Sequence, residues 1–196
     1  MISLLPALLL ALGPGPQAGA ERPNIVFILA DDLGWTDLGC QGSRYYETPH
    51  LDRLASVGMR FPNAYAAAPN CAPTRAALMS GQWAPRTGVY TVGSSARGRE
   101  EYRRLVPAPN RTELDGEVQT FAEDLQAAGY RTAHLGKWHL GDGPDTGPEA
   151  QGFDFNLGGD HRGHPPSYHA PYAKGGGAPP HGLERAPAGE YLTAPW

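Results

Sequence analysis

Residues 71–75, with the sequence CAPTR, place a cysteine and an arginine four positions apart around a proline. Proline suits the first turn of a helix, because its missing N–H would have no partner there. Cys71 is therefore predicted at a helix N-terminus, where unpaired N–H groups and the helix dipole favour an anion. Arg75, one turn further on, adds a fixed charge and paired donors. The pattern indicates a site that holds an oxyanion beside a sulfur atom.

A second interpretation of the same cysteine is structural. The chain has two cysteines, Cys40 and Cys71, and two cysteines in an exported chain often form a disulfide. Residues 71–75 alone leave both interpretations open. The motifs elsewhere in the chain decide between them.

Two adjacent acids, Asp31 and Asp32, directly follow an apolar run. Residues 24–30, NIVFILA, are continuously apolar and partly β-branched, which is typical of a strand covered on both faces in a parallel sheet. Acids at the carboxyl end of such a strand lie where open α/β sheets bind ligands. The pair could bind a metal ion, although aspartates also cap turns.

A second short strand is predicted within residues 130–136, YRTAHLG, and it ends at Lys137 and His139. If this strand is parallel to the first, the carboxyl ends of both meet at one edge of the sheet. The two basic residues would then lie near the paired aspartates. The alternative is a strand end that is only solvated.

Three helices are predicted from their start and stop signals. They begin at Pro49, Cys71 and Thr120 and end before Gly58, Gly81 and Gly129. Thr120 and Glu123 have the spacing of a capping box. Their predicted buried faces contain Leu51, Leu54 and Ala55, then Leu78 and Met79, then Phe121, Leu125 and Ala128. Strands alternating with helices predict an α/β fold.

The N-terminus resembles an export signal. Residues 2–12 are apolar, and small residues follow up to Ala20, which predicts a signal peptide over residues 1–20. The apolar run is too short to span a bilayer comfortably, so we expect a periplasmic or secreted protein without stable membrane insertion. Residues 21–196 would then form the exported chain.

The net charge of −4, without a cluster of basic residues, gives little attraction to nucleic acid or anionic membranes. A small solute or a glycan is the expected partner. The chain has 26 Gly and 20 Pro, many of them after Gly141, so residues 160–196 are predicted to be mostly loop.

Two longer segments carry a resemblance to a known family. CAPTRAALMSG and GYRTAHLGKWH resemble the two signatures of the formylglycine-dependent, arylsulfatase-type sulfatases of the alkaline phosphatase superfamily. The likeness extends over residues 24–159. It implies a mostly parallel central sheet with helices on both faces, of which this chain is the N-terminal part, truncated at its C-terminal end.

The resemblance implies a nucleophile and a metal ion. Cys71 would be oxidised to formylglycine (3-oxoalanine) by a maturation enzyme, which makes that enzyme an expected partner. Asp31, Asp32 and the modified Cys71 would bind a divalent cation, Ca²⁺ in most members, with Mg²⁺ as the alternative. Oxygen donors of this kind suit a hard cation.

Three basic residues complete the site that the resemblance implies. Arg75 would steady the modified residue, and Lys137 and His139 would contact the sulfate and hold the nucleophile. Thr74 departs from the more frequent serine, and Asn70 stands where an apolar or small residue is commoner. The cysteine, the proline and the arginine of the signature are intact.

The expected function is hydrolysis of a sulfate monoester, with a sulfated carbohydrate as the favoured substrate over a small aryl ester. One alternative is a phosphatase or phosphodiesterase of the same superfamily. Another is a catalytically idle fragment that binds sulfated glycans.

Asn110 begins a glycosylation sequon, and His161, His164 and His169 are interpreted as surface histidines.

Overall fold

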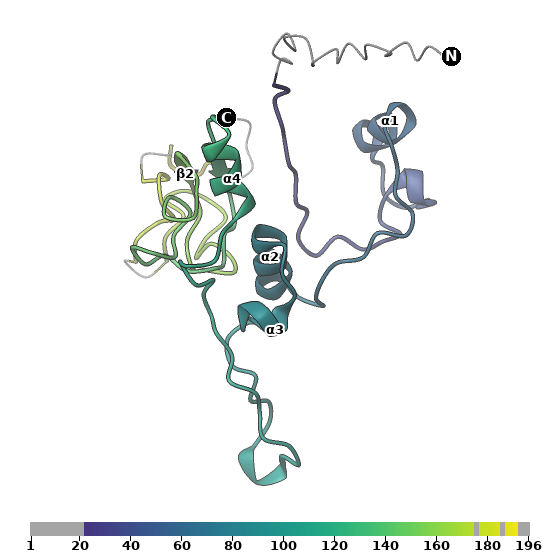
Figure 1. The fold of residues 1–196 in the computed structure, drawn as a ribbon. Helices are drawn as coiled ribbons and strands as arrows, with labels where there is room; N and C mark the ends of the chain where they lie inside the picture. Colours follow the sequence, from purple (N-terminus) through teal and green to yellow (C-terminus); the bar gives the residue numbers. More distant parts are fainter. Residues whose placement is uncertain (1–21, 175–176, 185–186, 192–196) are drawn as a thin grey trace, which may run out of the picture. The chain divides into compact units, whose positions relative to one another are not determined.

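The structure is a computed structural model of the 196-residue chain and describes residues 22–174, 177–184 and 187–191 (Figure 1). The chain divides into two compact units, Met1–Val57 and Gly58–Trp196, and each is described by itself. The predicted signal peptide, residues 1–20, lies outside the described residues.

The first unit contains a short 3₁₀ helix, η1 (Gly39–Gln41), and the helix α1 (Pro49–Val57). The predicted start of α1 at Pro49 is confirmed. Asp52 in its first turn accepts hydrogen bonds from the N–H of Cys40 (2.6 Å) and from the hydroxyl of Thr48 (3.0 Å). This carboxylate therefore joins η1 to the N-terminus of α1.

The predicted strand over residues 24–30 is wrong for this structure. The segment has no strand assignment, and its side chains are exposed, Val26 by 84% and Ile28 by 82%. Leu51 and Leu54 of α1, predicted to be buried, are also exposed. A strand covered on both faces needs a paired strand and packing helices, and these exposed side chains are not covered in this way.

The second unit carries the remaining elements. They are α2 (Cys71–Ser80), α3 (Ala84–Thr87), η2 (Glu100–Tyr102), α4 (Phe121–Ala127), β1 (Ala133–Leu135) and β2 (Phe155–Leu157). The two strands are parallel, with Ala133 opposite Phe155. The α/β class is as predicted, whereas the partner of β1 is β2, which the sequence did not predict, and not residues 24–30. After Leu157 the described residues contain only one isolated bridge, between His169 and Tyr191, in agreement with the expected loop region.

Small side chains allow the helices of this unit to pack closely. Ala76 on α2 and Ala122 on α4 are fully buried in one core. Its larger members are Met79, Val89, Leu114, Trp138, Leu140 and Phe153. The predicted burial of Met79 is confirmed, whereas Ala128 is exposed and its place is taken by Ala122. The core thus lies between α2, α4 and the segment that follows β1.

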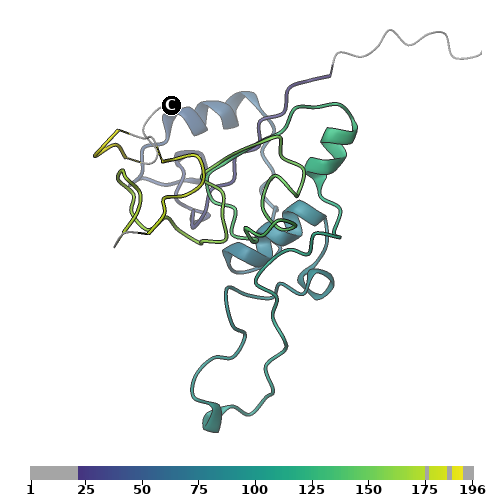
Figure 2. The ribbon, with the colours of Figure 1, turned by 90° about the vertical axis from the view of Figure 1, so that its left-hand side faces the viewer.

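One long excursion leaves this core between α3 and α4. In both views the chain runs out after α3, turns near η2 and comes back before α4 (Figures 1 and 2). Its base is closed by the N–H of Arg111, which donates to the carbonyl oxygen of Gly88 (2.9 Å).

The predicted capping box of α4 is confirmed, and a substitution at Thr120 tests how much it stabilises the protein. The Thr120 hydroxyl accepts from the N–H of Glu123 (3.3 Å), the Glu123 carboxylate accepts from the N–H of Thr120 (2.7 Å), and the same hydroxyl donates to the carbonyl of Gln151 (2.8 Å). We expect Thr120→Val, which keeps the shape but loses the hydroxyl, to reduce the free energy of unfolding by about 1–2 kcal/mol. Urea denaturation of the full-length protein measures it. Thr120→Ser is the control, and equal stability of the two variants would contradict the role of the hydroxyl.

Candidate functional site

Cys71 is the first residue of α2, as the sequence predicts. Asn70 before it is extended (φ −145°), and its carbonyl oxygen accepts the first helical bond, from the N–H of Thr74 (3.3 Å). Pro73 lies within the first turn, where no N–H is required. Cys71 is half-buried and forms no disulfide among the described residues.

Thr74 anchors the loop that leads into α2. Its hydroxyl donates to the carbonyl oxygen of Ala68 (2.9 Å). A serine can make the same bond, so the departure from the commoner residue preserves this contact.

Arg75 joins the two signature segments. Its guanidinium Nη1 donates to the carbonyl oxygen of Lys137, which lies 62 residues further along the chain. Lys137 follows β1 within two residues, as predicted from the strand end. The structure therefore holds the helix that bears Cys71 and Arg75 against the segment that contains Lys137, within the second unit.

His139 has an unusual backbone and a close neighbour. Its φ is +65°, and its N–H donates to the carbonyl oxygen of Asp160 (2.9 Å). A Cβ at Gly163 would lie only 2.7 Å from Cε1 of the His139 ring. The loop after β2 thus holds the backbone of His139, and glycine at position 163 leaves room for its imidazole.

His134, on β1, belongs to the same region but was not singled out from the sequence. Its ring meets those of Trp138 and Phe153 edge to face, at 5.2 and 5.3 Å. Burial lowers the pKa of the His134 imidazole, and the nearby charge of Arg75 acts in the same direction, while a hydrogen bond with Asn156 opposes them. A neutral imidazole beside the Arg75 guanidinium avoids a repulsion between two cations.

Two of the three predicted metal ligands, Asp31 and Asp32, lie in the first unit. Asp31 and Asp32 are exposed on the turn after residues 24–30, and Asp32 has a φ of +58°. Their carboxylates are the hard oxygen donors that Ca²⁺ and Mg²⁺ prefer. No cluster of three or more potential metal-binding side chains occurs in the described ranges. The association of these aspartates with Cys71 therefore stays a prediction.

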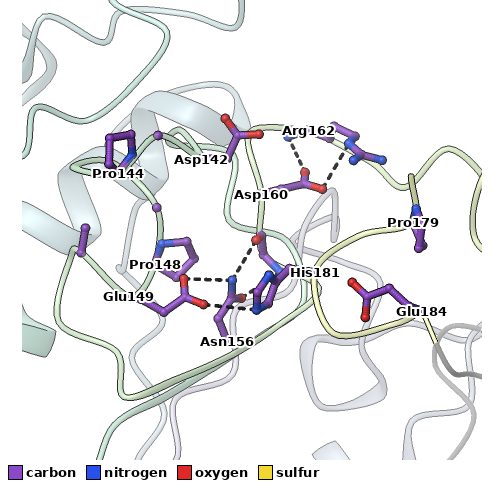
Figure 3. Close-up of a pocket in the computed structure, with 14 residues that line it drawn as sticks. Asp142, Pro144, Pro148, Glu149, Asn156, Asp160, Arg162, Pro179, His181 and Glu184 are labelled. Carbon is purple, nitrogen blue, oxygen red and sulfur yellow. Dashed lines mark hydrogen bonds and ion pairs between the residues drawn. The ribbon is translucent and has the colours of Figure 1, made fainter. Parts of the chain in front are cut away.

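A polar pocket of about 460 Å³ is formed by loop residues between positions 142 and 184 (Figure 3). Its charged and polar lining is Asp142, Glu149, Asn156, Asp160, Arg162, His181 and Glu184. None of the predicted site residues lines it. The connection to them is the bond from His139 to the backbone of Asp160.

Several charged and polar groups of this pocket contact one another. Arg162 Nε lies 3.1 Å from a carboxylate oxygen of Asp160. Glu149 accepts from the amide of Asn156 (3.2 Å) and pairs with His181 (3.3 Å). Four carboxylates outnumber the basic groups of the lining, so the pocket does not favour a sulfate ion. The lining joins positions 142–184, and no contiguous sequence motif reveals it.

These observations define an α/β fragment with a helix-terminal cysteine tied to a strand-end lysine, and comparison with known proteins identifies the family. The sulfatase family model matches residues 23–184, and the chain belongs to the sulfatase family.

The match to known relatives covers most of this chain but only part of each relative. N-acetylgalactosamine-6-sulfatase of Sus scrofa is 42% identical over 144 residues, which is 74% of this chain and 27% of the relative. Arylsulfatase A of Homo sapiens is 46% identical over 154 residues, which is 78% of this chain and 28% of the relative. The chain thus spans about a quarter of the length of these relatives.

Solved structures agree with the fold. The crystal structure of Ps i-CgsB gives a TM-score of 0.60 at 34% identity and covers 71% of this chain and 29% of that chain. The structure of BT4656 in complex with its substrate D-glucosamine-2-N,6-O-disulfate gives 0.53 at 34%, covering 69% and 23%. Among the described residues, no helix combines the length and the apolar character needed to cross a bilayer.

The lowered pKa of His134 predicts how stability depends on pH. Because the folded-state pKa lies below the ordinary 6.5, the unfolded chain binds more protons between the two values. The free energy of unfolding is therefore not reduced by His134 above about pH 6.5, and it falls as the pH drops from there through the folded-state pKa. We expect His134→Gln to flatten this acid limb in urea unfolding measured from pH 7.5 to pH 5. His164→Gln, at an exposed histidine, is the control, and an unchanged slope for His134→Gln would refute the assignment.

Proposed function

We propose that this chain is the nucleophile-bearing part of a sulfatase that hydrolyses a sulfate monoester to an alcohol and inorganic sulfate. The observation that carries the proposal is the bond from Arg75 to the carbonyl of Lys137, because it unites the helix end at Cys71 with the second signature segment. Membership of the sulfatase family supports it.

In this proposal a maturation enzyme converts Cys71 to formylglycine, and the hydrated aldehyde is the nucleophile. One hydroxyl of the hydrate attacks sulfur and the alcohol leaves. The other hydroxyl then loses its proton, the aldehyde re-forms and sulfate departs. This is covalent catalysis in two easier steps. The N-terminal N–H groups of α2, Arg75 and Lys137 offset the negative charge on the sulfate oxygens, and His139 holds the nucleophile and the sulfate.

A bound divalent cation would add a further positive charge at the sulfate. Asp31, Asp32 and the modified Cys71 would hold it, with Ca²⁺ preferred and Mg²⁺ as the alternative. The two aspartates fit such an ion by donor type, and further oxygen ligands are needed to complete its shell of six to eight.

We propose a sulfated carbohydrate as the substrate and export to the periplasm or the outside of the cell as the location. The relatives named N-acetylgalactosamine-6-sulfatase and the complex of BT4656 with a sulfated glucosamine support the carbohydrate. The apolar N-terminal run supports export.

Mass spectrometry of the peptide that contains Cys71 tests the nucleophile. After expression of the full-length protein with a formylglycine-generating enzyme, we expect the defined mass loss of the thiol-to-aldehyde conversion. We also expect Cys71→Ala to lose turnover of an aryl sulfate by a factor of about 10³ or more. Arg75→Lys keeps a charge but loses the paired donors, so a fall in kcat of about 10² is expected.

The assay is run in parallel with the sulfate and phosphate esters of one phenol. Faster phosphate turnover would favour the phosphatase alternative. An unmodified thiol at position 71 in a fully active protein would overturn the proposed nucleophile.

Metal removal provides a separate test of the acids. We expect chelation to abolish turnover by the full-length protein and Ca²⁺ to restore it, because the cation supplies positive charge in the transition state. Asp32→Asn, which removes one negative charge at nearly constant shape, should raise the Ca²⁺ concentration needed for half-maximal activity. Asp37→Asn, outside the pair, is the control, and activity that is insensitive to chelation would contradict a metal role.

A further inference from the structure

Asn110 uses all the hydrogen-bonding capacity of its side chain within the chain, although it begins a sequon that ends at Thr112. Its Oδ1 accepts from the backbone N–H groups of Tyr90 (2.7 Å) and Thr91 (3.0 Å). Its Nδ2 donates to the carbonyl oxygens of Thr91 (3.0 Å) and Gly93. A carboxamide has two acceptor positions and two N–H donors, so all four are occupied.

These four bonds close the base of the long excursion. Asn110 lies on the returning segment and its partners lie on the outgoing one, 17 to 20 residues earlier. The excursion itself runs away from the core (Figures 1 and 2). The position of Thr91, at the core end of the outgoing segment, is therefore set by Asn110 from the other side.

Thr91 connects the base of the excursion to the helix that bears Cys71. Its hydroxyl oxygen accepts from the side-chain Nδ2 of Asn70 (3.0 Å), the residue directly before Cys71. The Asn70 side chain makes no cap bond to its own helix, although asparagine is a favoured N-cap residue. The amide that normally caps a helix instead joins α2 to the base of the excursion.

We propose that Asn110 is a positioning residue for Cys71, acting through Thr91 and Asn70. Its catalytic meaning rests on the proposed sulfatase function, whereas its effect on the thiol of Cys71 does not. Loss of the Asn110 amide frees the backbone of Thr91, and the bond to Asn70 then no longer fixes the first residue of α2. Small displacements of a nucleophile lower kcat strongly, even without a change in substrate binding.

The same geometry bears on the sequon. A glycan on Nδ2 would replace one of the two donor hydrogens and would require space where the carbonyl oxygens of Thr91 and Gly93 lie. The native fold therefore excludes a glycan at Asn110. The folded protein is expected to carry an unmodified asparagine there even when it is made in a eukaryotic secretory pathway.

Three variants of the full-length protein test the positioning role. Asn110→Ala removes all four bonds. Thr91→Val removes the acceptor for Asn70 but leaves the four bonds of Asn110, which go to backbone groups. Thr112→Ala destroys the sequon and leaves these contacts in place, so it is the matched control.

Two readouts are compared. In protein made without a maturation enzyme, the alkylation rate of the Cys71 thiol by iodoacetamide should rise several-fold in Asn110→Ala and Thr91→Val. In matured protein, kcat should fall about tenfold and KM should change less than about twofold. Thr112→Ala should match the wild type in both.

The outcomes separate the hypotheses. If Thr91→Val leaves both readouts at the wild-type level, Asn110 is only a structural residue and the positioning role is overturned. Thr91→Val decides the question even if Asn110→Ala does not fold. A change in alkylation without turnover in any protein would contradict the sulfatase function and leave the positioning role intact. A glycan at Asn110 of the folded, secreted protein would overturn the assignment of its amide.

Discussion

The arrangement of the second unit depends on the hydrogen bond between the Arg75 guanidinium and the carbonyl oxygen of Lys137. This bond requires that α2 and the end of β1 keep a fixed position relative to each other, although they are far apart in sequence. Ala76 and Ala122 let α2 and α4 approach closely, and the buried Trp138 fixes the segment that follows Lys137. The core therefore serves one geometric constraint, which is the distance from a helix N-terminus to a strand end.

Local signals predicted the elements of this unit well. The capping box at Thr120 and the helix start at Cys71 rest on hydrogen bonds within a few residues, which the residue types specify directly. The short strand before Lys137 was also predicted, although its partner, β2, lies about twenty residues further along the chain and was not. The strand over residues 24–30 was wrong because a buried strand is defined by the strands and helices that cover it, and these residues are exposed and have no strand assignment. Apolar composition alone does not provide them.

The parts of the candidate site that the sequence did not predict depend on contacts between separate loops. The carbonyl of Asp160 holds the backbone of His139, glycine at position 163 leaves room for its ring, and burial lowers the pKa of His134. No periodic pattern or fixed residue spacing in the sequence indicates any of these features. They arise only when the loop after β2 folds back onto the segment after β1.

The excursion between α3 and α4 has a further consequence. Because it is fastened at its base, a change in the number of residues near η2 alters only the entropy of closing a loop, which grows slowly with length. Insertions and deletions there should be tolerated without disturbing the helix that bears Cys71. Evolution, or an engineer, can therefore remodel this arm, for example to append a tag or a recognition sequence, as an independent part of the protein.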